Sequence, residues 1–294
     1  MKTAFLGPRG TFSEEAALAY TQGVGELEAF SSFPALTAAV ESGLAQAAVL
    51  PIENSIGGSV ITTLDLLIHE TPLKISAEVV VPVRHFLVSA PGATLDTIKV
   101  VTSHPQGLAQ CRRFIEHYLP DAAQVAALST AGAVQEISQA GDPTRAAIGP
   151  WRAVELYGGH VLAEDIQDVH TNVTRFVALT HHDTSPTGDD KTSLAFTVRK
   201  NVPGALHKVL TYFAEADIQL TKVESRPTQA WLGDYVFLID FEGHRDDPHV
   251  AQAIARAREA CATLTVFGSY PRFPLESLRG VVAAAGFPGG DEPS

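Results

Sequence analysis

The first segment with chemical potential is a polar cluster that follows an apolar stretch. Residues 47–52 are apolar, and Glu53, Asn54 and Ser55 come directly after them, followed closely by two glycines. Binding sites in α/β proteins are commonly built at the carboxyl ends of strands, and glycines let a ligand approach the backbone closely. We therefore expect this cluster to line a site rather than to form an ordinary turn.

A second cluster lies at residues 172–179, which read Asn-Val-Thr-Arg-Phe-Val-Ala-Leu. The pattern predicts a strand that is buried on both faces, so Arg175 near its start needs an anionic partner. A guanidinium binds carboxylates in a bidentate manner. The partner is either a substrate carboxylate or one of the 33 acidic residues of the chain. A regular strand would point Thr174 and Arg175 in opposite directions, and both can face one site only if the strand is irregular there.

Three predicted strand-to-helix junctions add backbone donors to these side chains. Thr11-x-x-Glu14 and Ser103-x-x-Gln106 have the form of capping boxes, and Ser129-Thr130 has the form of a simpler cap. Capping alone would explain each of them. A helix N-terminus is also an anion site, because its free N–H groups carry a partial positive charge. Three such ends at one edge of a sheet would bind a small dianion.

The composition makes this local source of positive charge important. The formal net charge is 21 − 33 = −12, and 45% of the residues are hydrophobic. Such a chain is expected to fold into a globular protein without a membrane span, and its charge argues against nucleic acid or an anionic membrane as a partner. Cys111 and Cys261 suggest neither a disulfide framework nor a zinc site. No phosphate loop, Ser-His-Asp order or metal-ligand cluster is recognisable, so we expect no metal and no cofactor.

The elements expected around these residues define two parts of the chain. Before residue 181, short apolar runs alternate with helical patterns, which predicts an α/β domain with a mostly parallel sheet. Residues 1–180 would form two lobes around a cleft, the first from about 1–80 plus 165–180 and the second from 81–164. The expected strands are 3–6, 47–52, 75–81, 85–89, 98–102, 125–128, 146–148, 161–166 and 174–180. The expected helices are 12–21, 34–41, 60–69, 105–118 and 131–140.

The second part begins after a polar stretch. Residues 181–191 contain no aliphatic side chain, which indicates a linker. Residues 192–272 then show the order βαββαβ of a ferredoxin-like domain, and residues 273–294 are expected to form a tail.

Six motifs, in order along residues 1–272, resemble the prephenate dehydratase family. The motifs of the first domain are Gly7-Pro-x-Gly-Thr-Phe-Ser, Pro51-x-Glu-Asn-Ser-x-x-Gly58, Ser103-His-Pro-Gln106 with Gln110, and Asn172-x-Thr-Arg-Phe176. Those of the second domain, Asn201-x-Pro-Gly-Ala-Leu206 and Glu224-Ser-Arg-Pro227, resemble the regulatory ACT module of this family. The resemblance implies a two-lobed periplasmic-binding-protein-like α/β catalytic domain followed by an ACT domain.

The resemblance also implies an activity: the decarboxylating dehydration of prephenate to phenylpyruvate in phenylalanine biosynthesis. Our hypothesis is that Thr174 donates to the departing hydroxyl group and that Arg175 and helix N–H groups bind carboxylate. The catalytic residues implied are Thr174, Arg175, Asn54, Ser103 and Gln110. The substrate-binding residues implied are Thr11, Glu53, Ser55, Gln106, Ser129, Thr130 and Phe176. Leu128 stands where some members of the family have an acid.

The ACT module implies a regulatory ligand, L-phenylalanine, and a homodimer or homotetramer with this ligand between chains. The residues expected to bind it are Asn201, Gly204, Ala205, Leu206, Glu224, Ser225 and Arg226. A dimerisation module that has lost its ligand is the alternative. For the whole protein, the alternatives are an arogenate dehydratase, whose preference a nearby acid such as Glu53 could decide, and a non-catalytic ligand-binding protein. The N-terminus lacks the long apolar core of a signal peptide, so we expect a cytoplasmic location.

Overall fold

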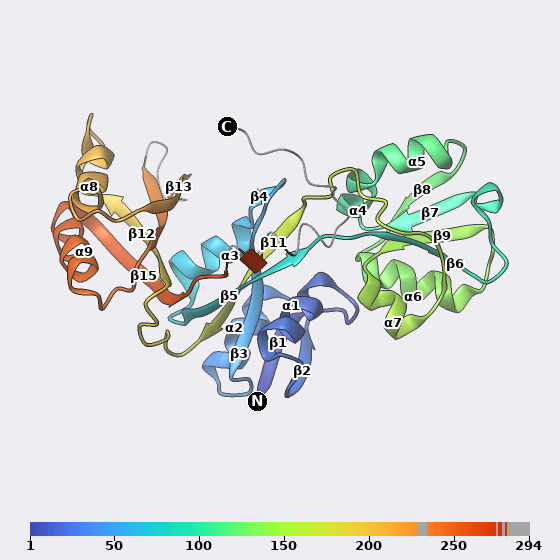
Figure 1. Cartoon of the computed structure of the whole chain (residues 1–294), viewed down its shortest axis with the longest axis horizontal. Coiled ribbons are helices and arrows are strands. Elements are labelled where there is room, and N and C mark those ends of the chain that lie inside the picture. Colours follow the sequence, from blue (N-terminus) through green and yellow to red (C-terminus); the bar gives the residue numbers. More distant parts are fainter. Residues whose placement is uncertain (229–233, 275, 278–279, 281–294) are drawn as a thin grey trace.

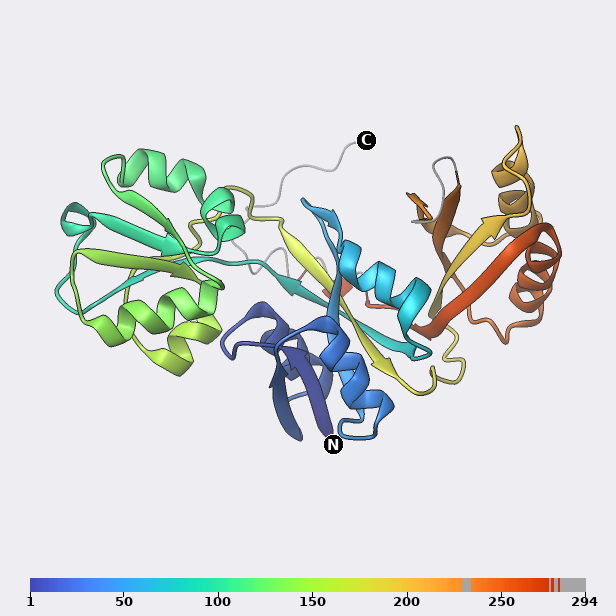
Figure 2. The ribbon, with the colours of Figure 1, turned by 180° about the vertical axis from the view of Figure 1, so that it is seen from behind.

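A computed structural model describes residues 1–228, 234–274, 276, 277 and 280 of the chain. Three β-sheets with flanking helices follow one another along the long axis of the molecule (Figure 1). We call the parts that contain them lobe 1, lobe 2 and, after the module that its motifs resemble, the ACT domain. Lobe 1 lies between the other two (Figures 1 and 2). Most of the predicted tail, 273–294, lies outside the described residues.

Lobe 1 contains the N-terminal sheet, which chain segments distant in sequence complete. The strand order is β2-β1-β3-β11-β5, and the short β4 pairs with β3. Its strands are β1 (Lys2–Leu6), β2 (Glu26–Phe30), β3 (Ala47–Asn54), β4 (Gly58–Ser59), β5 (Lys74–Pro82) and β11 (Val173–Thr180). Its helices are α1 (Phe12–Thr21), α2 (Phe33–Glu41), α3 (Ile61–Asp65) and the π-helix η1 (Leu66–Glu70).

Lobe 2 holds the second sheet, with strand order β10-β6-β9-β7-β8. Its strands are β6 (Phe86–Ser89), β7 (Val100–Ser103), β8 (Ala123–Ala126), β9 (Arg145–Gly149) and β10 (His160–Ala163). Its helices are the 3-10 helix η2 (Leu95–Thr97), α4 (Pro105–Gln110), α5 (Arg112–Tyr118), α6 (Thr130–Ala140) and α7 (Trp151–Tyr157). The chain passes between the lobes twice, from β5 to β6 and from β10 to β11.

The expectation of a mostly parallel sheet is wrong for both lobes. Parallel pairing joins β1 to β2 and β3, and β7 to β8 and β9. β11 runs antiparallel to both β3 and β5, and β6 runs antiparallel to both β9 and β10. The strands that flank the two crossings account for these antiparallel pairs, and a reading of local periodicity gives no direction for a strand.

Several predicted elements also change in detail. The predicted helix 105–118 is broken at Cys111, whose φ of −117° departs from helical geometry. The predicted helix 60–69 divides into α3 and η1. β2 and α7 were not expected, because β2 carries two glutamates and the apolar face of α7 is short.

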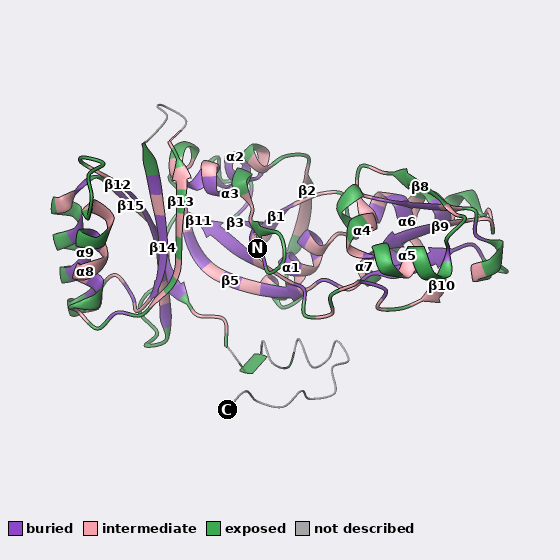
Figure 3. Ribbon diagram, turned by 90° about the horizontal axis from the view of Figure 1, so that it is seen from above, coloured by how far each residue is buried: buried purple, intermediate pink, exposed green. Residues whose placement is uncertain are grey.

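The ACT domain has the sheet order β13-β14-β12-β15. Its elements are β12 (Asp190–Val198), α8 (Ala205–Ala214), β13 (Leu220–Pro227), β14 (Tyr235–Glu242), α9 (Pro248–Ala260) and β15 (Cys261–Pro271). Helices α8 and α9 cover the face of the sheet that points away from lobe 1 (Figures 1 and 3). The other face packs on lobe 1, where Leu238, Phe267 and Tyr270 share one hydrophobic core with Val177 and Leu179 of β11.

β11 therefore has two different faces. Val177 and Leu179 face the ACT domain, whereas Phe176 and Ala178 pack in a separate core with Phe5 and α1. Within the described residues, no helix is long and apolar enough to cross a bilayer.

Candidate functional site

A cavity of about 370 Å³ lies between the two lobes. Eight of the predicted site residues line it: Thr11, Asn54, Thr174 and Phe176 from lobe 1, and Gln106, Gln110, Ser129 and Thr130 from lobe 2. We call this cavity the cleft. It brings together predicted residues that are up to 165 positions apart (Thr11 and Phe176).

Thr174 and Asn54 are direct neighbours in the cleft, because they are paired across β11 and β3. Asn54 Nδ2 donates to Thr174 Oγ1 at 3.0 Å and to Asn172 Oδ1 at 2.8 Å. Asn54 Oδ1 accepts the backbone N–H groups of Ile56 and Gly57, which fixes the orientation of the amide. Since Thr174 Oγ1 is the acceptor of the Asn54 amide, its own O–H group remains available to donate to a ligand.

On the lobe 2 side, His85 holds Gln110. His85 Nε2 lies 2.8 Å from Gln110 Oε1, and the His85 backbone N–H donates to Gln167 Oε1. Burial lowers the pKa of His85, while the bond to Gln110 acts in the opposite direction. The ring is therefore neutral near pH 7 and donates through Nε2, which leaves the Gln110 amide N–H groups for a ligand.

The N-terminal ends of α1, α4 and α6 all contribute residues to the cleft. The Ser129 hydroxyl caps α6 by accepting the Gly132 N–H at 2.9 Å, as predicted. The other two caps differ from the prediction. His104, not Ser103, caps α4, and the Thr11 side chain caps no N–H group of α1.

No Lys, Arg, Asp or Glu residue is among the described residues that line the cleft. Its polar groups are hydroxyls, amides, imidazoles and the backbone at the helix starts. Leu128, fully exposed, stands at its rim. An anion in the cleft would therefore be held by N–H and O–H donors rather than by a formal positive charge.

The expectation that Arg175 faces the same site as Thr174 is wrong. The irregularity lies in β3, where Ile52 has no partner opposite β11, and β11 itself alternates regularly. Arg175 thus points to the ACT-domain face of the sheet, where its guanidinium meets Glu53, Glu78 and Asp240. The alternative weighed from the sequence, a structural ion pair with acids of the chain, is what the structure shows.

Three further predicted residues do not line the cleft. Glu53 pairs with Arg175 on the ACT-domain side. The Ser103 hydroxyl is fully buried and donates to the Ile148 carbonyl at 2.6 Å, so it ties β7 to β9. The Ser55 hydroxyl accepts the Val173 N–H at 3.0 Å and so supports the turn after β3.

The residues predicted to bind a regulatory ligand occupy two places in the single chain. Gly204, Ala205 and Leu206 lie at the start of α8, where Gly204 has a φ of +82°, and Asn201 precedes them in the connection from β12. Glu224 and Arg226 instead contact lobe 1, through Ser59 and Asp65 respectively. Ser225, between them, is exposed. One chain therefore does not bring these residues into one pocket, and the expected site between two chains stays a prediction.

A second cavity, of about 520 Å³, lies on the other side of the segment that joins β5 to β6. Side chains alternate along this segment, so that Val83 and His85 face the cleft while Arg84 and Phe86 face the second cavity. Phe12 lines both cavities.

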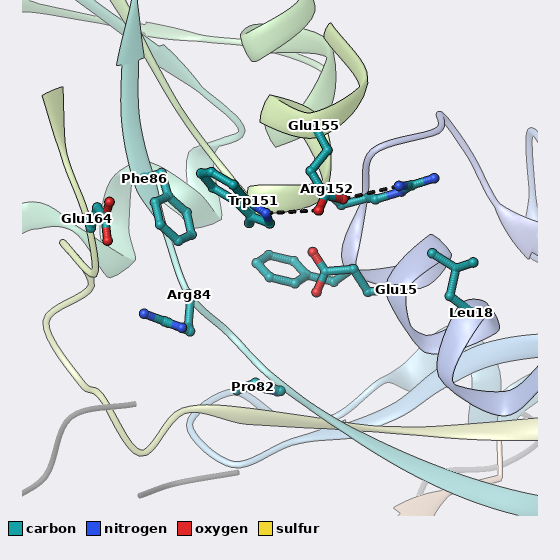
Figure 4. Close-up of a pocket in the computed structure, with 10 residues that line it drawn as sticks. Glu15, Leu18, Pro82, Arg84, Phe86, Trp151, Arg152, Glu155 and Glu164 are labelled. Carbon is teal, nitrogen blue, oxygen red and sulfur yellow. Dashed lines mark hydrogen bonds and ion pairs between the residues drawn. The ribbon is translucent and has the colours of Figure 1, made fainter. Parts of the chain in front are cut away.

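In this second cavity, α1 of lobe 1 meets α7 of lobe 2 (Figure 4). Arg152 pairs with Glu14 at 3.3 Å and with Glu155 at 3.1 Å. Glu15 makes no ion pair among the described residues, and burial raises the pKa of its carboxyl to about 7. Arg152 opposes this shift, whereas the nearby Glu155 acts in the same direction as burial.

Two residues that the sequence reasoning did not assign to the site help to build it. His85 positions Gln110, and its only signal in the sequence is a histidine between two apolar runs. Asn172 accepts from the Asn54 amide and is buried. It belongs to the Asn-x-Thr-Arg-Phe motif, which could have marked it as a partner of Asn54. Among the described residues, no group of three His, Cys, Asp or Glu side chains could hold a metal ion.

The fold and the cleft define a class: a two-lobed α/β protein with an uncharged interlobe site and a C-terminal ferredoxin-like domain. Within this class, the family model for prephenate dehydratase matches residues 3–184 and the model for the ACT domain matches residues 192–259. The chain belongs to the prephenate dehydratase family, which confirms the resemblance of its motifs and makes it a lyase.

Curated relatives and solved structures agree with this assignment. The chain is 39% identical over 284 residues to a prephenate dehydratase of Mycolicibacterium vanbaalenii, covering 91% of this chain and 90% of the relative. It is 38% identical over 276 residues to a bifunctional chorismate mutase/prephenate dehydratase of Aquifex aeolicus, covering 94% and 75%.

Two solved structures are similar over nearly the whole chain. A prephenate dehydratase of Arthrobacter aurescens in complex with L-Phe has a TM-score of 0.85 and 36% identity, covering 92% of this chain and 90% of that one. A protein described as GqqA, a novel type of quorum quenching acylase, has a TM-score of 0.83 and 30% identity, covering 94% and 100%.

Proposed function

We propose that the cleft binds prephenate and converts it to phenylpyruvate, carbon dioxide and water. The observation that carries this proposal is the Asn54–Thr174 hydrogen bond, which leaves the Thr174 O–H group free to donate into an uncharged cleft. The bond between the ring and its carboxylate breaks, and its electron pair completes the aromatic ring. The bond between the ring and its hydroxyl group breaks at the same time, and that group leaves as water after it receives a proton.

Substrate binding rests on donors from both lobes. Prephenate is a dianion, with one carboxylate on the ring and one on the pyruvyl group. The starts of α1 and α6 supply backbone N–H groups from opposite walls, and Gln106 and Thr130 supply side-chain donors from lobe 2. The Thr11 hydroxyl donates to the Pro8 carbonyl at 3.1 Å, so the contribution of Thr11 is its place at the start of α1. Holding the carboxylate that is lost away from bulk water favours its departure as neutral carbon dioxide.

Thr174 acts on the leaving hydroxyl group. Its O–H donates to the departing oxygen, and Asn54 fixes the direction of that donation through the bond to Oγ1. Solvent returns a proton to Thr174, so the net proton in the departing water comes from solvent. Positioned proton transfer of this kind contributes roughly 10²–10⁴-fold to a rate. Gln110, held by His85, serves as a second directed donor from lobe 2.

The uncharged cleft favours prephenate over arogenate, the alternative substrate. Arogenate carries an ammonium group in place of the pyruvyl ketone and would call for a carboxylate nearby. Glu53, the acid considered for this role, points toward the ACT domain. A purely ligand-binding role is less well supported, since it gives no reason for a hydroxyl donor held in place by Asn54.

The acylase described for one structural relative calls for different chemistry. Acyl transfer by a hydroxyl nucleophile needs a base in contact with it. Among the described residues of the cleft, neither Ser129 Oγ nor Thr174 Oγ1 is hydrogen-bonded to a histidine; their partners are Gly132 N–H and the Asn54 amide. The site therefore supports a dehydratase better than an acylase.

The ACT domain binds L-phenylalanine as an effector in this proposal. Support comes from the relative solved in complex with L-Phe and from the start of α8, where free N–H groups suit an amino-acid carboxylate. β13 is an edge strand of the ACT sheet, with Val223 half exposed and Ser225 exposed. Pairing of two such edges would form a homodimer, or half of a homotetramer, in a cytoplasmic enzyme.

The test is a direct assay of the purified protein with prephenate and arogenate side by side. We expect rapid formation of phenylpyruvate from prephenate and slower formation of phenylalanine from arogenate. Turnover of arogenate alone would show that the substrate is arogenate rather than prephenate. Absence of turnover of both would overturn the proposed activity.

A further inference from the structure

Strand β11 separates the cleft from the ACT domain, and successive side chains of this one strand serve the two sides. Thr174 lines the cleft, whereas Arg175 reaches the ACT domain. β3 repeats this arrangement with Asn54 and Glu53. Because Thr174 pairs with Asn54 and Arg175 pairs with Glu53, two consecutive cross-strand pairs lie back to back on the two faces of one sheet.

The guanidinium of Arg175 is shared between the two domains. Its Nη2 donates to Asp240 Oδ2 of β14 at 2.7 Å and lies 3.2 Å from Glu53 Oε2 of β3. Its Nη1 donates to Glu78 Oε2 of β5 at 3.2 Å. Only 13% of the Arg175 side chain is exposed. One nitrogen thus connects an ACT-domain carboxylate with the residue next to Asn54.

The ACT-domain side of this contact is held in place. Asp240 Oδ1 accepts the Ser193 hydroxyl at 2.7 Å, and Ser193 is 2.7 Å from the buried Tyr270 hydroxyl. Burial would raise the pKa of Asp240, but Arg175 and Ser193 outweigh it and hold the pKa below its usual value. Asp240 is therefore a carboxylate at neutral pH, and it faces Arg175 in a fixed position.

A second ACT-domain residue acts on the same pair from β13. Lys222 Nζ lies 3.5 Å from Glu53 Oε1 and donates to Ser59 Oγ at 2.6 Å. Ser59 in turn donates to Glu224, a residue of the predicted effector motif. The Glu53–Arg175 pair is thus bound to β13 through Lys222 and to β14 through Asp240.

We infer that Arg175 is a positioning residue that couples the state of the ACT domain to the Asn54–Thr174 pair, and so to kcat. This inference rests on the proposed function. A shift of β14 relative to lobe 1 changes how Arg175 Nη2 is shared between Asp240 and Glu53. Residues 53–54 and 174–175 are consecutive in their strands, so displacement of the outer pair reaches the Thr174 hydroxyl through the backbone.

Asp240→Asn tests the inference in the full-length protein, since it removes one charge and keeps the shape of the side chain. We expect kcat to fall by roughly 5–150-fold, the usual range of a coupling between sites, with KM for prephenate within about twofold of wild type. We also expect the response of activity to added L-phenylalanine to shrink. A merely structural residue would lower thermal stability without separating kcat from KM in this way.

The matched control is Asp183→Asn. Asp183 is also a buried acid paired with an arginine, Arg245, at 2.7 Å, and it accepts the Ser269 N–H, but it does not contact Arg175. We expect wild-type kcat and a normal response to L-phenylalanine. Ser193→Ala is a second variant that loosens Asp240 without removing its charge, and it should lower kcat less than Asp240→Asn does. It carries the test alone if Asp240→Asn does not fold.

The inference is overturned if the folded Asp240 or Ser193 variant keeps both wild-type kcat and the full response to L-phenylalanine. It is also overturned if Asp183→Asn lowers kcat equally, because the effect would then report loss of domain packing. Wild-type protein is assayed first. If it does not turn over prephenate, the proposed function fails, whereas turnover with unaffected variants removes only this inference.

Discussion

The two faces of β11 differ in charge, although the residues that form them are adjacent in sequence. One face lines an uncharged cleft, and the other carries a buried set of ion pairs. On the cleft side, the groups available to an anionic substrate are hydroxyls, amides and helix ends, with no charged side chain among the described lining residues. On the ACT-domain side, Arg175 meets Glu53, Glu78 and Asp240 in a buried set of ion pairs.

The difference shows what each kind of interaction is suited to. Uncharged donors bind an anion without a fixed counter-ion, so the site can release a product that has one charge fewer than the substrate. Buried ion pairs are costly to break, because loss of one partner leaves an uncompensated charge. They suit a contact that holds two domains together. Substitutions on the cleft side should therefore change activity more than stability, whereas substitutions on the ACT-domain side should lower stability and, at Asp240, also lower kcat through Arg175.

The largest expected effect lies on the cleft side. Thr174→Ala removes the donor to the leaving group, and we expect kcat to fall by roughly 10²–10⁴-fold with little change in KM. Steady-state kinetics with prephenate measures both. Thr174→Ser keeps the hydroxyl and serves as the control. Near-normal kcat in the alanine variant would remove Thr174 from the mechanism.

On the other side, Glu78→Gln should act mainly on stability. Glu78 is 1% exposed and accepts from Lys191 and Arg175, so loss of its charge should lower the free energy of unfolding by about 3–5 kcal/mol. Urea unfolding followed by circular dichroism measures this change. Glu116→Gln, in an exposed pair with Arg112, should cost less than about 1 kcal/mol. If both variants lost the same free energy of unfolding, the buried ion pairs would be no more important for stability than an exposed one.

Glu15 is a partly buried carboxyl that makes no ion pair among the described residues. Burial raises its pKa to about 7 from the ordinary value of 4.5, so the folded state retains a proton that the unfolded state has lost. Stability therefore falls as pH rises from about 4.5 to 7, by up to about 3 kcal/mol, and stays lower above that window.

Glu15→Gln, which cannot ionise, should escape this fall. Relative to wild type it should be more stable at pH 8, while the advantage should vanish at pH 4.5. Thermal unfolding at the two pH values compares the proteins, with Glu259→Gln on the exposed side of α9 as the control. An advantage of the same size at both pH values would show that the effect is not ionisation.

The smallest expected effect tests the helix ends. Ser129→Asp retains a capping oxygen but adds negative charge beside the cleft, and we expect KM to rise by about tenfold, since 1.4 kcal/mol of repulsion corresponds to that factor. Ser32→Asp makes the same change at the start of α2, away from the cleft. It should leave KM unchanged. If both variants have wild-type KM, the α6 N-terminus does not contact the substrate.

Much of the cleft could be predicted from the sequence, because its residues stand at the ends of elements. Thr11, Asn54, Ser129 and Thr174 each follow or begin a recognisable strand or helix, and such positions meet at the edges of sheets. The relative direction of the strands could not be predicted, because the hydrophobic pattern of a strand indicates which residues are buried and not which strand it pairs with.

Arg175 shows why the rest could not be predicted. An arginine in a buried strand demands an acid, but the sequence does not say whether that acid belongs to the substrate or to another domain. The answer depends on the packing of the ACT sheet against lobe 1, a contact between segments more than 60 residues apart. The alternation of side chains along a strand was the one feature of the sequence that separated these two possibilities. Thr174 and Arg175 are adjacent, so they could face one site only if β11 were irregular.

Because successive residues of β11 face different sides, insertions and deletions in this strand should be poorly tolerated during evolution. Inserting or deleting one residue directly after Asn172 would exchange the two faces of the strand. An arginine would then enter the cleft, and a threonine would face Asp240. Insertions or deletions within residues 172–176 should therefore abolish activity and disrupt the packing of the ACT domain on lobe 1 at the same time. Additions at the exposed residues 185–186 of the polar segment before β12 should be tolerated.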